Sequence, residues 1–260
     1  MVSVSFSTPQ PRHNVANAAT IDDDIRALPA ARRWVFFLSL AFMVGAWLLA
    51  MVLPWKTARP LTQVMGAVGC VLCLGDCVGL ISRSQWRALG VGVAVNVLIG
   101  GLVNAVTLPF YFDAIGTVGA TIVAGPLVGS AVAMTSHGIG ALFSKSLLLF
   151  TICQLMTVAG VWAMVLRKST GRLDLLILGG TLIGAVTGAV GGFTAVHLFG
   201  VTRRAGINEL IKVIASLGGY PAIWTIVLSS LTDIVDKTLS LMLSVAVLKT
   251  YKSWTSLLRS

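Results

Sequence analysis

Long apolar runs with almost no charge dominate this chain, and they restrict it to folds that a membrane can hold. Runs of about 18 or more apolar residues can cross the hydrocarbon core as helices. Such runs cover residues 34–54, 61–82, 88–109, 114–143, 146–166, 173–199 and 221–248. Charged residues make up 11% of the 260 residues, against about 25% in a soluble domain. We therefore predict an all-α polytopic membrane bundle.

The sequence carries no recognisable catalytic motif. It has a single glutamate, Glu209, and it lacks a His-Glu-x-x-His pair, a Walker lysine loop and a Gly-x-Ser-x-Gly turn. Its four cysteines lie in apolar runs without a His or Cys cluster beside them, which indicates packing rather than a metal site. We expect a non-catalytic protein with no cofactor and no bound metal.

Basic residues in the short connections orient the spans. The link at 167–172 is strongly basic and is therefore expected in the cytoplasm. The same rule places both termini in the cytoplasm, with the polar residues 1–33 as a cytoplasmic tail. We expect the membrane to be the plasma membrane. The net charge of +10 then reflects orientation and contact with lipid headgroups rather than nucleic-acid binding.

This orientation puts both ends of residues 114–143 on the outer side. A Gly125-Pro126 pair interrupts the run after about 11 residues, roughly half the hydrocarbon thickness. We expect a short helix, a turn at this pair and a returning helix, all covered by neighbouring helices. Counting both arms, the chain has eight expected membrane segments. Residues 34–85 form an N-terminal hairpin that precedes a core at 86–260.

Two groups of ionisable residues lie in or beside these spans. Asp113 follows the third span, where it either caps the next helix or lines a ligand cavity. The last span contains three ionisable residues within five positions: Asp233, Asp236 and Lys237. Such groups inside an apolar helix should face protein and pair with one another. They form either a structural ion pair or the support of a cavity.

Small residues and outer arginines leave further alternatives open. Ala88, Gly90, Gly92 and Ala94 let another helix approach closely, either inside the bundle or on a second membrane protein. Arg203 and Arg204 meet either an anionic ligand group or lipid headgroups.

Four short motifs resemble one family when taken in order. They are Tyr-Phe-Asp-x-Ile-Gly-Thr at 111–117, Gly-Pro-x-x-Gly at 125–129, Phe-Gly-Val-Thr at 199–202 and Asp-x-x-Asp-Lys at 233–237. The stretch 86–255 thus resembles the substrate-binding S components of energy-coupling factor transporters, the vitamin-uptake branch of ABC transporters. The N-terminal hairpin and Arg203-Arg204 depart from that family's pattern.

The resemblance implies a six-helix subunit that binds a small water-soluble micronutrient at its outer side. It also implies docking on a transmembrane coupling subunit and transport driven by two cytosolic ATPases. The implied docking residues are Ala88, Gly90, Gly92 and Ala94. The implied substrate-binding residues are Tyr111, Asp113, Thr117, Thr202, Arg203 and Arg204, supported by Asp233, Asp236 and Lys237. The alternatives are a ligand-sensing membrane domain, a structural membrane subunit and a solitary ion-coupled carrier.

Overall fold

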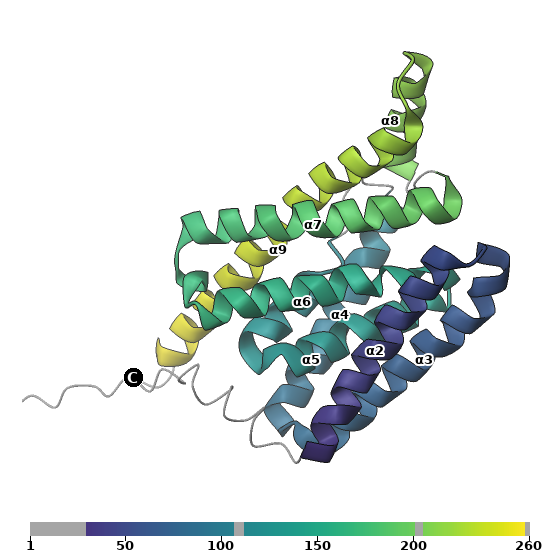
Figure 1. Ribbon diagram of the computed structural model, residues 1–260. Coiled ribbons are helices and arrows are strands. Elements are labelled where there is room, and N and C mark those ends of the chain that lie inside the picture. The colour runs from purple at the N-terminus through teal and green to yellow at the C-terminus, as the bar shows by residue number, and fades with distance from the viewer. Residues whose placement is uncertain (1–29, 107–111, 201–204, 258–260) are drawn as a thin grey trace, which may run out of the picture.

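A computed structural model describes residues 30–106, 112–200 and 205–257, and all regular structure within them is helical (Figure 1). The helices are α2 (Ala30–Val52), α3 (Trp55–Leu80), α4 (Arg83–Ala105), α5 (Ile115–Ala141), η1 (Lys145–Phe150), α6 (Thr151–Leu166), η2 (Ser169–Gly171), α7 (Leu173–Phe199), α8 (Ala205–Ser216) and α9 (Pro221–Leu257). Within these residues, six segments are long and apolar enough to cross a membrane. The predicted all-α polytopic bundle is confirmed.

The six segments begin in α2 and end in α7. They are Trp34–Val52, Trp55–Leu80, Arg83–Val103, Ile115–Ala141, Lys145–Leu166 and Leu173–Phe199. The 37-residue α9 is not among them, and it carries Asp233, Asp236 and Lys237 near its centre. The expected count of eight membrane segments therefore stays a prediction.

The N-terminal hairpin of α2 and α3 packs tightly and shares a core with α5. Pro54 separates the two helices, since it cannot donate the backbone hydrogen bond that a continuous helix would need. At Gly69, an added Cβ would lie 3.0 Å from the carbonyl oxygen of Ser39, so α2 and α3 are in close contact. The Cys70 thiol donates to the carbonyl of Met134 at 3.3 Å, which joins the hairpin to α5.

The predicted break in α5 is confirmed at Gly125. Its φ of 86° and ψ of 178° belong to a region that only glycine adopts readily, and Pro126 then starts a second arm. In one straight helix, residues 117 and 136 would lie about 28 Å apart. Here the side-chain amide of Asn96 reaches Thr117 Oγ1 at 2.9 Å and Ser136 Oγ at 3.4 Å. The two arms therefore fold back beside each other.

A line of glycines on α7 forms a close and extensive helix contact where α9 crosses α7 in Figure 1. Gly180, Gly184, Gly188 and Gly192 are spaced four residues apart and face α9. A Cβ at Gly188 would lie 2.5 Å from the carbonyl oxygen of Ser229. Small side chains allow this approach, and it lets side chains of α7 and α9 meet in the bundle interior.

The connection between α7 and α9 contains the amphipathic helix α8. Ile207 and Ile211 are buried, whereas Leu210 and Val213 on the same helix are exposed. Figure 1 places α8 beside the N-terminal end of α9, away from the centre of the bundle.

Candidate functional site

A cavity of about 610 Å³ lies between α4, α5, η1, α6, α7 and α9. Its principal polar lining residues are Asn96, Asp113, His137, Gln154, Thr187 and Asp233. Its apolar walls include Val97, Ile139, Phe143, Leu147, Phe150 and Phe199. Such a space, mostly apolar with a few convergent polar groups, has the usual character of a small-molecule site.

The cavity occupies one half of the bundle. Its lining comes from the C-terminal halves of α4 and α7, the end of α5, the start of α6 and the N-terminal half of α9. The basic connection at 167–172 joins the C-terminal end of α6 to the N-terminal end of α7, and these two ends lie away from the cavity. The predicted orientation therefore puts this half on the outer side of the membrane.

Among the described residues, side chains from two different helices lie against Asp113. Gln154 on α6 donates its amide to Asp113 Oδ1 at 2.9 Å. His137 on the second arm of α5 places Nε2 3.6 Å from Asp113 Oδ2, and its Nδ1 lies 3.1 Å from Thr151 Oγ1. Of the two interpretations left open by the sequence, the structure thus places Asp113 in the cavity wall.

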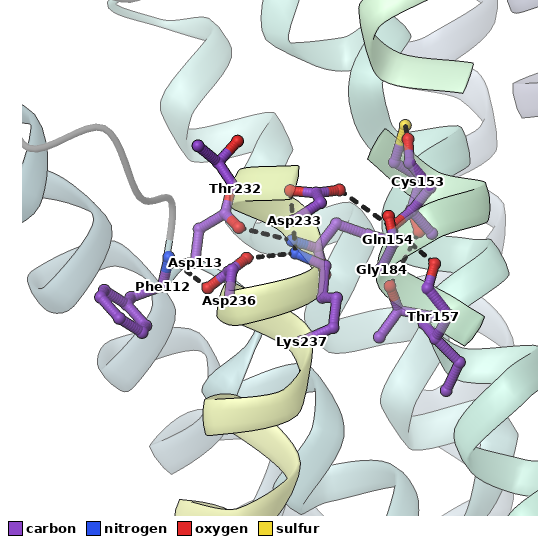
Figure 2. Close-up of polar contacts among 12 residues, drawn as sticks. Phe112, Asp113, Cys153, Gln154, Thr157, Gly184, Thr232, Asp233, Asp236 and Lys237 are labelled. Carbon is purple, nitrogen blue, oxygen red and sulfur yellow. Dashed lines mark hydrogen bonds and ion pairs between the residues drawn. The ribbon is translucent and has the colours of Figure 1, made fainter. Parts of the chain in front are cut away.

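Near the centre of α9, three charged residues form one connected cluster, Asp233, Asp236 and Lys237 (Figure 2). Lys237 Nζ lies 2.5 Å from Asp236 Oδ2 and 3.9 Å from Asp233 Oδ1. Asp236 also accepts a hydrogen bond of 2.8 Å from the backbone N–H of Phe112. This bond ties the residue before Asp113 to α9, so Asp236 and Lys237 support the cavity wall.

Asp233 belongs to both the ion cluster and the cavity. Its Oδ2 accepts a hydrogen bond of 2.9 Å from Thr187 on α7, and it lines the cavity beside Thr187 and Ser229. Asp233 thus lines the cavity, whereas Asp236 and Lys237 lie outside its lining.

Thr117 has a structural position behind the cavity. It is fully buried and is not a lining residue. Its hydroxyl accepts from Asn96, while Asn96 Oδ1 accepts from the backbone N–H of Gly116 at 2.7 Å. The remaining predicted binding residues Tyr111, Thr202, Arg203 and Arg204 lie outside the described residues.

The predicted docking residues divide between two faces of α4. Gly90 and Ala94 are exposed, and an added Cβ at Gly90 would meet no atom within 4 Å. Gly92 is buried instead, because the backbone carbonyl of Gly116 and the side chain of Val132 pack against it. Ala88 also packs against the core. Gly92 is therefore not available for docking in this structure, whereas docking through the partly buried Ala88 stays a prediction.

Sequence reasoning did not single out Gln154, Thr187 and Ser229. Each is a polar residue inside a long apolar run, and polar groups at membrane depth usually face protein or a cavity. The presence of polar residues in apolar runs was visible in the sequence, but it could not show which of these residues lie around the same cavity. Within the described residues, no group of three or more His, Cys, Asp or Glu residues has the arrangement of a metal site.

Comparisons of this chain with protein-family models, with curated proteins and with solved structures found no match.

Proposed function

We propose that this protein is the substrate-capture subunit of an ATP-driven importer for a small, water-soluble, vitamin-like micronutrient. It works in the plasma membrane with both termini in the cytoplasm. The observation that carries this proposal is the cavity of about 610 Å³, whose wall holds Asp113, His137, Gln154 and Asp233. Ionisable groups inside a membrane bundle are costly, and they usually mark a path or a site for a polar molecule.

The position of the motifs adds support to this proposal. Asp113, from the motif at 111–117, and Asp233, from the motif at 233–237, are 120 positions apart in sequence, yet both line the one cavity. Gly125 in a third motif provides the break that returns His137 to the same wall. This convergence is what the resemblance to S components implies for a substrate site.

The exposed face of α4 supports a membrane partner. Gly90 and Ala94 lie there beside the exposed apolar side chains of Val91 and Leu98. A face with small residues lets a helix of another subunit approach closely within lipid. We propose that a transmembrane coupling subunit docks here and that two cytosolic ATPases attached to it supply the energy. The chain itself binds substrate and catalyses no reaction.

The test is affinity purification of the full-length protein from its native membrane in mild detergent, followed by mass spectrometry of proteins and released small molecules. We expect a coupling subunit, two ATPases and a bound metabolite. Gly90→Leu should remove the protein partners and keep the metabolite. Gly75→Leu on α3 is the matched control, because Gly75 also has no atom within 4 Å of an added Cβ.

Recovery of folded protein with neither partners nor metabolite would contradict the proposal. That result would favour a structural membrane subunit. A metabolite without any ATPase would favour the ligand-sensing alternative.

A further inference from the structure

The N-terminal hairpin of α2 and α3 packs against the cavity walls from outside. The lining residues begin at Asn96, so the hairpin lies outside the cavity itself. It nevertheless contacts two elements that do line the cavity, η1 and α7. In Figure 1, the turn between α2 and α3 lies near the C-terminal end of α7. The hairpin can therefore act on the cavity through its walls.

The short helix η1 has one side on the cavity and another on the hairpin. Residues three apart share a face of a 3-10 helix. Leu147 and Phe150 have this spacing, and both line the cavity. Leu148 lies on a different face and packs into the hairpin core, where an added Cβ at Gly66 on α3 would lie 3.2 Å from its Cδ1. A shift of the hairpin would therefore move η1 and the cavity wall with it.

The cavity mouth lies beside η1. Phe143 and Ser144 come just before this helix, and both are lining residues that are exposed, Phe143 to 89%. A lining residue that is also exposed marks the place where the cavity opens. The position of η1 thus bears directly on entry to the cavity.

Trp47 on α2 is joined to α7 beside the cavity. Its indole Nε1–H donates to Thr194 Oγ1 at 3.0 Å. An indole N–H can only donate, and an unpaired donor at membrane depth is costly, so this bond holds the two helices together. Thr194 is fully buried, and the next residue, Ala195, lines the cavity. The bond therefore fixes α2 against a helix that forms the cavity wall.

A second aromatic side chain of the hairpin contacts the end of α7. The rings of Trp55 and Phe199 meet edge to face, with their centroids 6.0 Å apart and their planes at 86°. This arrangement is a favourable one for aromatic pairs. Phe199 itself lines the cavity. The hairpin thus contacts the cavity wall at three places: η1, the middle of the last turns of α7, and the end of α7.

We propose that the N-terminal hairpin is a working part of the substrate site, acting through the cavity walls. It holds η1 and the C-terminal end of α7 in place and so limits the size of the molecules that pass the mouth. Trp47 and Trp55 are its positioning residues on the hairpin, and Leu148 is the one on η1. This inference rests on the proposed function, since it takes the cavity to be the substrate site. It also gives a role to a segment that departs from the pattern of S components.

The chain contains its own reporter of access to the cavity, the half-buried thiol of Cys153, which is among the lining residues. The test treats the purified full-length protein with N-ethylmaleimide, a small thiol reagent, or fluorescein maleimide, a bulky one. Peptide mass spectrometry gives the labelling rate of Cys153, and each rate is divided by that of free glutathione with the same reagent. We expect the bulky reagent to label Cys153 more slowly than the small one in the unmodified protein.

Two substitutions remove the same hydrogen bond from its two ends, Trp47→Phe and Thr194→Val. Each should raise the rate of Cys153 labelling by fluorescein maleimide about five-fold, as expected when the closed arrangement loses one hydrogen bond. The double variant should show no further increase, because the bond is already absent in each single variant. Trp34→Phe is the matched control, since Trp34 is on the same helix and is 73% exposed. It should leave the rate unchanged.

The three cysteines of α3 show whether the hairpin stays folded, because all of them are buried: Cys70, Cys73 and Cys77. A general loss of structure would expose them together with Cys153. If Trp47→Phe exposes them, Thr194→Val decides the result, because it alters α7 alone. Unchanged labelling of Cys153 while the α3 cysteines stay protected overturns the proposal, as do additive effects in the double variant. Equal normalised rates of the two reagents on the unmodified protein also overturn it, and that comparison needs no variant.

The purification experiment separates this inference from the proposed function. Faster labelling of Cys153 in the two variants of a protein that has neither partners nor metabolite would support the inference and contradict the importer. Unchanged labelling in a protein that does carry a coupling subunit, two ATPases and a metabolite would overturn the inference and leave the capture function standing.

Discussion

The contact between α7 and α9 at Gly184 gives the sharpest prediction about stability. A Cβ added at Gly184 would meet the carbonyl oxygen of Asp233 and would lie 2.5 Å from Ile234 Cα. Carbon atoms pack well at about 3.5–4.0 Å, so the helices would have to separate locally by about 1 Å. The opposing atoms belong to the α9 backbone and cannot rotate away.

The expected cost of Gly184→Ala follows from two opposing terms. Overpacking a tight contact typically costs about 1–3 kcal/mol. Alanine favours the helix by about 1 kcal/mol relative to glycine, which offsets part of that cost. We therefore expect the free energy of unfolding to fall by up to about 2 kcal/mol.

The measurement is reversible unfolding in mixed micelles of a mild detergent and a denaturing detergent. Gly75→Ala is the control, since it makes the same chemical change in α3 with no atom within 4 Å of the new Cβ. We expect that control to be neutral or slightly stabilising. If Gly184→Ala is as stable as Gly75→Ala, the close approach of α7 and α9 is refuted.

Three further substitutions test the parts that shape the cavity, each measured with the same unfolding assay. Asn96→Ala removes hydrogen bonds to both arms of α5 and should cost about 2–4 kcal/mol; no measurable loss would mean that this amide does not hold the arms together. Gly125→Ala forces alanine into a conformation suited to glycine and should cost about 1–3 kcal/mol, whereas the Gly75→Ala control should cost nothing. Asp236→Asn and Lys237→Met, combined in a double-mutant cycle, should show a coupling energy of about 1 kcal/mol or more, and additive effects would argue against the buried pair.

The sequence was sufficient to predict the six long apolar helices and the break in α5. The predicted run 173–199 coincides with α7, Leu173–Phe199, because the length of an apolar run is itself the physical requirement for crossing a bilayer. The break at Gly125 was predictable for a similarly local reason: a glycine before a proline permits backbone angles that end one helix and start the next.

The composition of the candidate site was only partly predictable. Asp113 and Asp233 were found because a carboxylate in or beside an apolar run is unusual and costly. Gln154 was not found, although it holds Asp113 from 41 positions away. An uncharged polar residue in a span has many permitted environments, and its sequence neighbours do not say which one it occupies.

The sequence by itself determined the long apolar helices, the break in α5 at Gly125 and the presence of charged residues inside the last helix. Each of these features depends on the length or local chemistry of one segment. Only the tertiary structure decided which side chains meet. Gly90 lies open while Gly92, two residues later, packs against α5. Thr187 reaches Asp233 from 46 positions away. Such meetings depend on how each helix is rotated and where it crosses its neighbours, which the contacts of the whole bundle set together.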